Sequence, residues 1–377
     1  MHLYIHAPFC VRRCSYCDFA IAVRKRLPVQ QYVECIQRER ALLGSADPGA
    51  VPRGEPTAGA GTIYFGGGTP SLLPADAIAT ILLDVSRSTS SLDAFEVTLE
   101  ANPDDVTPEK ASAWRAAGVN RVSLGAQSFD DRVLQWMHRT HDAARIATAV
   151  DVLARAGIVN VSLDLIFALP QELERDWARD LERAIAIGPA HLSLYGLTVE
   201  ERTPLARWIS RGASSAPDDD RYAEEYLRAH ERLAAAGYHF YEVSNAARDG
   251  RRSHHNSAYW SGRAYTGLGP AAHSFDGHTR RWNLASWEAY RRAVTAGRSA
   301  VESEELLTSA QRRLEDIYLA LRTDRGMEMP AGPPARLPAW VSSGWVRVRD
   351  GRVVCTPEGW LRLDALVRDL TGAPEAA

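Results

Sequence analysis

Apolar stretches with strand character alternate with amphipathic, helix-period stretches through the first two thirds of the chain. Six strands are expected, at residues 3–8, 62–67, 95–101, 121–127, 161–169 and 191–199. Helical spacing lies between them, at residues 29–43, 75–88, 108–118, 143–157 and 175–188. Strands that alternate with helices form βα units and a parallel sheet. Six such units, wound right-handed, predict an α/β fold, a partial (β/α)6 barrel.

The pattern changes after a further helix at residues 221–237 and a strand at 238–245. No period runs through residues 248–283, which hold four of the eleven histidines, many glycines and several aromatics. A long irregular stretch in a compact protein is usually functional or disordered, and the aromatics argue against disorder. We therefore expect three parts: a barrel core at 1–240, a connecting region with a functional site at 241–302, and a separate module at 303–370.

The last part predicts a small winged-helix-like α+β module. Helices are expected at residues 310–323 and 334–345, then a hairpin at 346–359 with an Asp-Gly turn, and a closing helix at 360–370. Such modules often bind DNA. The net charge is −3 and no helix here is strongly basic, so we expect a packing or lid role and no nucleic-acid partner.

Composition supports a cytoplasmic protein. A length of 377 residues fits one large domain and a smaller one, and 45% apolar with 24% charged residues is ordinary for a globular chain. No apolar run approaches the ~18 residues of a membrane span. The first ten residues have no basic segment before an apolar stretch, so we expect no signal peptide. Residues 44–61, rich in Gly, Pro and Ala, are expected to form a loop.

Three of the five cysteines, Cys10, Cys14 and Cys17, fall within eight residues directly after the first strand. An odd, clustered set favours a metal site over disulfides. Cys35 and Cys355 lie in apolar surroundings and are expected in the core.

Thiolates select zinc or iron–sulfur clusters. Structural zinc requires four closed ligands, so the fourth would come from His6 or from a distant residue. The more economical interpretation is a 4Fe-4S cluster with three irons held by the three cysteines. Its fourth iron would then be open to a small molecule.

Polar residues mark the end of each expected strand. Active sites of parallel barrels form at the carboxyl ends of their strands, so these six segments are expected to meet at one pocket. The second strand leads into "YFGGGTP", where glycines let the backbone come close to a ligand. The strand-end residues are Cys10, 66–70, Glu100, Gln127, Asp164 and Thr198.

The cysteine loop, with Tyr16 before its last cysteine, resembles that of the radical S-adenosylmethionine (SAM) enzymes. This resemblance implies a barrel of the radical SAM type. It also implies that SAM chelates the open iron through its amino and carboxylate groups, and that one electron from the cluster cleaves the sulfonium to a 5′-deoxyadenosyl radical. The glycine loop resembles the family motif that holds the SAM amino group.

Further segments resemble the oxygen-independent coproporphyrinogen III oxidase family: "LYIHAPFC", "GGGTPSLL", "VTLEANP", "RVSLGAQSFDDRVLQWMHR" and "VSLDLIFALP". A carboxylate such as Glu100 or Asp164 can accept from ribose hydroxyls or an amine, and Arg139 can pair with a carboxylate. Read singly, Arg139 could instead be a surface charge and Asp164 a structural acid. The resemblance implies that SAM is contacted by Tyr4, Tyr16, Gly67, Gly68, Thr69, Glu100, Gln127, Arg139, Asp164 and Thr198.

Two departures separate this chain from the oxidases. They carry a fourth cysteine two residues after the third, and this chain has Phe19 there, which offers no thiol. "HNSAYW" also resembles the H-N-x-x-Y-W motif of a sister group, the HemW-type haem chaperones. An imidazole can ligate haem iron, and aromatic rings offer flat apolar surface. The expected haem residues are His255, Tyr259 and Trp260, with His254 as a competing ligand.

His273 and Trp282 lie close in sequence to this motif, and Arg280 and Arg281 could meet porphyrin propionates or simply be solvated. The favoured function is a haem chaperone that binds a 4Fe-4S cluster and SAM and delivers haem, its cargo, to acceptor proteins. The alternative is a coproporphyrinogen III oxidase that converts propionates to vinyl groups. A radical SAM enzyme acting on another substrate is a third possibility. Enzymatic activity is left open, and SAM cleavage would require an electron donor such as flavodoxin or ferredoxin.

Overall fold

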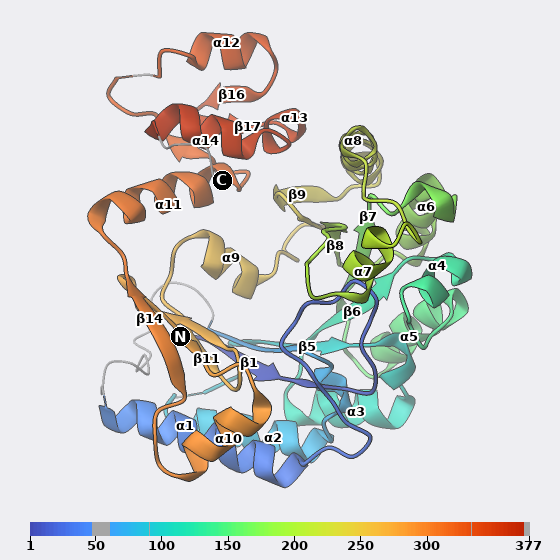
Figure 1. The fold of residues 1–377 in the computed structure, drawn as a ribbon, viewed down its shortest axis with the longest axis vertical. Coiled ribbons are helices and arrows are strands. Elements are labelled where there is room, and N and C mark those ends of the chain that lie inside the picture. Colours follow the sequence, from blue (N-terminus) through green and yellow to red (C-terminus); the bar gives the residue numbers. More distant parts are fainter. Residues whose placement is uncertain (47–60, 90, 333, 373–377) are drawn as a thin grey trace.

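The computed structural model describes residues 1–46, 61–89, 91–332 and 334–372, and its centre is a nine-stranded sheet ordered β11-β1-β4-β5-β6-β7-β8-β10-β9 (Figure 1). The six predicted strands run parallel in sequence order. They are β1 (His2–Ala7), β4 (Thr62–Gly67), β5 (Glu96–Ala101), β6 (Arg121–Gln127), β7 (Asn160–Phe167) and β8 (His191–Gly196). The end strands β11 and β9 do not pair with each other, so the barrel is partial, as predicted.

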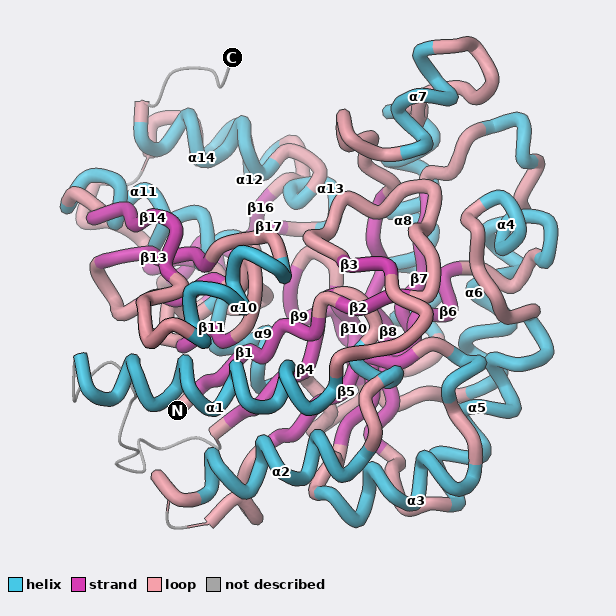
Figure 2. Tube along the Cα trace, turned by 60° about the horizontal axis from the view of Figure 1, so that its bottom comes forward, coloured by secondary structure: helices cyan, strands magenta, loops and turns pink. Residues whose placement is uncertain are grey.

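The predicted helices lie along the outer side of this sheet in chain order (Figure 2). They are α1 (Val29–Ala46), α2 (Ala75–Ser86), α3 (Pro108–Ala117), α5 (Ala143–Arg155), α6 (Trp177–Ile187) and α8 (Asp219–Ala235). Capping chemistry sets their ends. The Thr107 side chain accepts from Lys110 N at the start of α3, Pro108 takes the first helical position, and Gly118 ends the helix at φ +109°.

The core fills the space between the sheet and these helices. Ile5 pairs in register with Phe65, and both are fully buried. Strands covered on both faces carry near-continuous apolar runs, which is why the sequence shows them clearly. Cys35 and Cys355 are buried, as expected. None of the described helices could cross a membrane.

The structure corrects the sequence prediction in two places. The strand expected at 238–245 is a tight antiparallel hairpin, β9 (His239–Glu242) and β10 (Asn245–Ala247), because the chain turns at Ser244, whose carbonyl accepts from Leu194 N. The aperiodic stretch 248–283 is ordered. It holds α9 (His254–Trp260), β11 (Thr266–Leu268), β12 (His273–Phe275) and β13 (Thr279–Asn283).

Strand β11 adds a seventh parallel strand beside β1, and its three residues are too few to show a period. Other elements, most of them short, also escaped prediction. They are β2 (Phe9–Cys10), β3 (Ala22–Val23), α4 (Asp131–Trp136), α7 (Pro204–Ser210) and α10 (Trp287–Thr295). Residues 47–60 of the expected loop lie outside the described residues.

The C-terminal part follows the predicted helix–helix–hairpin–helix order and lies beyond α9 (Figure 1). Its hairpin turns at Asp350 and Gly351, with φ of +50° and +71°. Strand β14 (Val301–Leu306) pairs with β13, and the expected part boundaries at 240/241 and 302/303 fall inside β9 and β14. The other elements are α11 (Ser309–Leu321), β15 (Met327–Glu328), α12 (Leu337–Ser342), β16 (Val346–Arg349), β17 (Arg352–Cys355), α13 (Pro357–Trp360) and α14 (Leu363–Thr371).

A buried ion network ties the loops after β6 and β7 to α6 and α8. The Arg175 side chain is fully buried, 2.8 Å from Glu225 and 3.6 Å from Asp180. Glu225 also accepts from Ala168 N, and Asp180 accepts from Phe129 N. Removing one member would leave uncompensated charges in the interior.

Arg175→Ala is therefore expected to lower the free energy of unfolding by about 3–5 kcal/mol, measured by urea denaturation. The control is Arg228→Ala, which breaks an exposed pair with Glu224 on α8 and should cost no more than about 1 kcal/mol. Equal losses in the two variants would contradict the anchoring role of the network.

Candidate functional site

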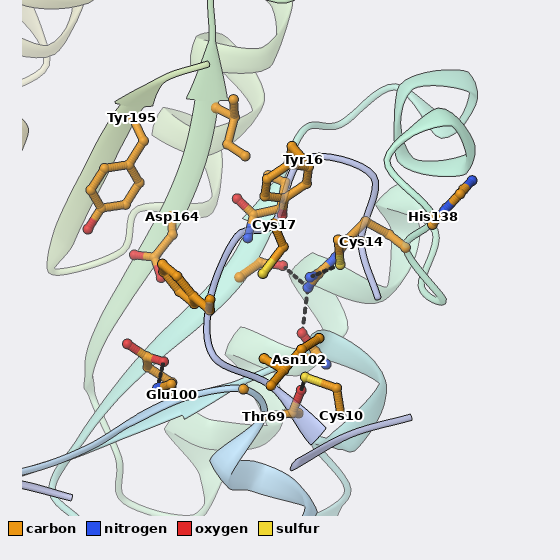
Figure 3. A pocket seen from close by; sticks show the side chains of 18 of the residues that line it. Cys10, Cys14, Tyr16, Cys17, Thr69, Glu100, Asn102, His138, Asp164 and Tyr195 are labelled. Carbon is orange, nitrogen blue, oxygen red and sulfur yellow. Dashed lines mark hydrogen bonds between the residues drawn. The ribbon is translucent and has the colours of Figure 1, made fainter. Parts of the chain in front are cut away.

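A cavity of about 360 Å³ lies at the carboxyl ends of the parallel strands (Figure 3). Its size is within the usual range of small-molecule sites, ~300–1,000 Å³. We name it the strand-end cavity. Of the residues predicted to hold the cluster and SAM, all but one line this cavity. They are Cys10, Cys14, Tyr16, Cys17, Gly67, Gly68, Thr69, Glu100, Gln127, Arg139, Asp164 and Thr198.

Tyr4 is the member that does not line this cavity. Its ring stacks on Tyr64 with centroids 6.1 Å apart, and Tyr64 forms part of the wall. The wall also contains residues that we did not predict, among them Asn102, Ser123 and Tyr195. Tyr195 is 45% exposed, next to last in a strand whose first four residues are buried. Its place near the carboxyl end of a predicted strand is the sequence signal that marks it.

The cysteine loop is held by backbone hydrogen bonds to three parts of the molecule. Ser15 N donates to Met137 O, and Ser15 O accepts from Leu205 N. Ala22 N donates to Pro8 O beside the first strand. In this loop conformation the three cysteines line the cavity, and Figure 3 shows Cys14 and Cys17 across from Cys10.

The thiols have few polar neighbours. Cys10 Sγ lies 3.4 Å from Thr69 Oγ1, and Cys14 Sγ lies 3.6 Å from Arg139 Nη1. Desolvation raises the pKa of Cys10 and raises that of Cys17 to about 11. Bound metal stabilises the thiolate form, so loading this site releases protons.

The donor set fits an iron–sulfur cluster better than closed zinc. His6, the fourth ligand considered from the sequence, already uses both ring nitrogens: Nε2 donates to Ala20 O at 3.1 Å, and Nδ1 lies 3.2 Å from the Tyr4 hydroxyl. His138 also lines the cavity, but Figure 3 shows its ring pointing away from the cysteines. Among the described residues, no three His, Cys, Asp or Glu side chains lie close enough together to hold a single metal ion. Three soft ligands line one side of a cavity whose opposite walls are polar, which suits a cluster with one iron open to a ligand.

The three glycines of the second loop are each required by packing. A Cβ on Gly66 would lie 2.8 Å from the Tyr4 ring, and one on Gly68 would lie 2.8 Å from the Pro8 backbone. Gly67 has a φ of +113° and packs on the His6 ring. The loop therefore lies directly against the first strand and brings its backbone to the cavity wall.

Two carboxylates form the acidic side of the cavity. Glu100 accepts from the Tyr64 hydroxyl at 2.9 Å and from Gly67 N at 3.0 Å. Asp164 accepts from Ser123 Oγ at 3.0 Å. Desolvation raises the pKa of Glu100 to about 7 and also raises the pKa of Asp164. Both can accept hydrogen bonds from hydroxyl or ammonium groups.

Arg139 and Gln127 also line the cavity, and both side chains lie beside Gly125 of β6. Arg139 is half-buried and not a surface charge; its Nη2 donates to Gly125 O at 2.8 Å. Gln127 has a φ of +66°, at the point where the β6–β7 register shifts. Left-handed backbone at a non-glycine residue is strained and is common beside functional sites.

The HNSAYW motif forms α9, and His255 within it is 1% exposed. Its Nδ1 is 2.7 Å from Thr62 Oγ1, and its Nε2 is 2.9 Å from the Tyr259 hydroxyl. Its ring stacks on Tyr64 at 4.9 Å. In this structure neither nitrogen of His255 is open to a haem iron, unlike the exposed ring of His254.

The other residues noted near the motif lie on the sheet β12-β13-β14. His273 stacks on Trp282 with centroids 6.0 Å apart. Arg280 pairs with Glu305 and Glu315, and Arg281 pairs with Asp276 and Glu304. These arginines are already neutralised by acidic partners.

Comparison with known proteins decides the family. The Radical SAM superfamily model matches residues 4–184. The chain is 39% identical to "Heme chaperone HemW" of Mycobacterium tuberculosis (strain ATCC 25618 / H37Rv), over 98% of this chain and 94% of that protein. The chain belongs to the HemW-type subfamily of the radical SAM superfamily.

Two other relatives are similar to most of this chain, one named as a HemW protein and one as a radical SAM protein. Identity to "Heme chaperone HemW" of Bacillus subtilis is 32%, covering 86% of this chain and 84% of that one. Identity to the mouse "Radical S-adenosyl methionine domain-containing protein 1, mitochondrial" is 36%, covering 86% and 74%. Membership of the superfamily implies a 4Fe-4S cluster and SAM as cofactors, and the matched residues 4–184 include all three cysteines.

A solved structure confirms the fold of this HemW-type chain. Coproporphyrinogen III oxidase (HemN) from Escherichia coli, described as a radical SAM enzyme, superposes with a TM-score of 0.80 at 20% identity. The superposition covers 98% of this chain and 89% of that one, so it includes the C-terminal part.

Glu100 makes the stability of the folded chain depend on pH. Its pKa rises from 4.5 to about 7 on folding, so between these values the unfolded chain loses the proton first and stability falls with rising pH. In Glu100→Gln this part of the pH dependence is absent. The difference in unfolding free energy between variant and wild type should change by on the order of 2 kcal/mol between pH 4.5 and 7.5, measured by urea denaturation. A difference that is constant across this range would contradict the burial of Glu100.

Proposed function

We propose that this chain is a haem chaperone that binds a 4Fe-4S cluster and SAM in the strand-end cavity and carries haem to acceptor proteins. The observation that carries the proposal is the alignment, over 98% of the chain, with a protein named heme chaperone. Phe19 supports it, because the residue at the fourth cysteine position of the oxidases is a 57% exposed apolar side chain.

We assign the three irons to Cys10, Cys14 and Cys17. When bound, the cluster supplies the electron that SAM cleavage requires. The acidic wall of Glu100 and Asp164 would accept from the ribose hydroxyls or the amino group of SAM, and Arg139 would pair with its carboxylate. The proposed SAM set is Tyr4, Tyr16, Gly67, Gly68, Thr69, Glu100, Gln127, Arg139, Asp164 and Thr198; all except Tyr4 line the cavity.

Tyr4 would act from behind the wall, through Tyr64 and the glycine loop. If SAM is cleaved, we propose flavodoxin or ferredoxin as the electron donor. Haem is cargo in this proposal and its acceptor is a separate protein. The cytoplasmic location stays a prediction from the sequence.

The second candidate function is coproporphyrinogen III oxidation. It is supported by the fold shared with HemN and by a cavity in which a radical precursor could be held. Phe19 argues against it, since no thiol is present at that position. Phe19→Cys asks only whether the missing thiol by itself prevents oxidation, and the variant should fold because the Phe19 side chain is exposed.

The purified, anaerobically reconstituted protein is expected to take up haemin with a shifted Soret band and to give no divinyl product from coproporphyrinogen III, SAM and dithionite. Phe19→Cys should leave both results unchanged, because a single thiol does not restore the whole oxidase site. Product formed over several turnovers by the wild type, analysed by chromatography, would contradict the chaperone proposal and favour the oxidase.

A further inference from the structure

A second cavity, of about 570 Å³, lies between α9 and α11 and shares no lining residue with the strand-end cavity. We name it the α9–α11 cavity. Figure 1 shows α9 lying between the barrel and α11. Its walls come from His2, Tyr241, one face of the segment 252–263, α11, the turn before β15 and Arg352. The volume suits a sizeable small molecule.

One histidine faces this cavity from the HNSAYW helix. His254 is exposed, while its backbone N donates to Glu96 Oε2 at 3.0 Å and fixes the start of α9. Its ring makes no hydrogen bond with any described residue. The adjacent His255 points to the opposite side, where its ring is closed in by Thr62, Tyr64 and Tyr259.

The charges of the cavity leave two cations free. Arg252 pairs with Asp324 at 2.6 Å, and the other lining acid, Asp316, pairs with Arg312 at 3.1 Å. Arg352 donates to Glu328 and to the Gly326 carbonyl. The two remaining lining arginines, Arg263 and Arg325, are exposed and form no ion pair within the described ranges.

Apolar side chains complete the walls. Trp260, Ala258, Leu319 and Ala320 offer surface for a flat ring system. An accessible imidazole, two unpaired arginines and apolar walls are the groups that recognise an iron porphyrin with two carboxylates. Neither the expected set of His255, Tyr259 and Trp260 nor the paired Arg280 and Arg281 presents this combination.

We propose that haem binds in the α9–α11 cavity, with His254 as axial ligand and Arg263 and Arg325 on its propionates. This inference rests on the proposed haem chaperone function. His255 then has a structural role, because it holds α9 against Thr62 and Tyr64, and the Tyr64 hydroxyl donates to Glu100 in the strand-end cavity. Its loss would affect haem binding through the fold.

The test is a haemin titration of the reconstituted protein followed by difference absorption at the Soret band. His254→Ala should lower haem affinity at least tenfold and move the band. His254→Tyr should keep binding but change the spectrum from imidazole to phenolate ligation. The matched control, His278→Ala, removes an exposed histidine from a turn far in sequence and should change neither.

The arginines are tested in the same titration. The double variant Arg263→Gln, Arg325→Gln should weaken haem binding severalfold without moving the Soret band, because the iron ligand is unchanged. Arg211→Gln, which removes an exposed arginine at the end of α7, is the control and should bind haem as the wild type does.

Two failures are distinguishable. No haem uptake by the wild type would overturn the proposed function itself. Normal uptake with a wild-type spectrum in His254→Tyr would overturn His254 as the ligand, and wild-type affinity in the arginine double variant would overturn the cavity assignment; neither result would touch the proposed function. His255→Ala is expected to lower the unfolding temperature; a lost Soret shift in that variant at unchanged unfolding temperature would also contradict the inference.

Discussion

The structure depends on a short loop that places three thiols, Cys10, Cys14 and Cys17, at the open rim of a parallel sheet. Backbone hydrogen bonds from Ser15 and Ala22 fix the loop, and the imidazole of His6, the fourth ligand considered from the sequence, is occupied by other partners. The opposite walls hold polar strand-end residues. A metal cluster held by the cysteines on one side would face those residues. This arrangement explains why strands far apart in sequence all carry polar residues at their carboxyl ends.

The HNSAYW motif packs against the barrel and holds α9 in place. Through Thr62, Tyr64 and Tyr259, His255 joins α9 to the strand that leads into the glycine loop. Glu100 is the next member, since it accepts from both Tyr64 and Gly67. This packed network of α9, Tyr64 and Glu100 separates the α9–α11 cavity from the strand-end cavity.

Much of this was predictable from the sequence. The buried parallel strands show continuous apolar runs, and their polar ends converge because parallel strands share one rim. The three-residue strand β11 and the β9–β10 hairpin were not predictable, since neither is long enough to show a period. The sequence also could not show which of the adjacent histidines, His254 or His255, is exposed. One turns to solvent and the other into the interior, and only the helix orientation decides which.

The central claim, an iron with no protein ligand that SAM can reach, is tested most directly by electron paramagnetic resonance of the reduced, reconstituted protein with and without SAM. We predict four irons per chain, lost in variants of Cys10, Cys14 or Cys17, and a cluster signal whose g-values change when SAM is added. A signal that SAM leaves unchanged, or a single bound zinc, would contradict this claim.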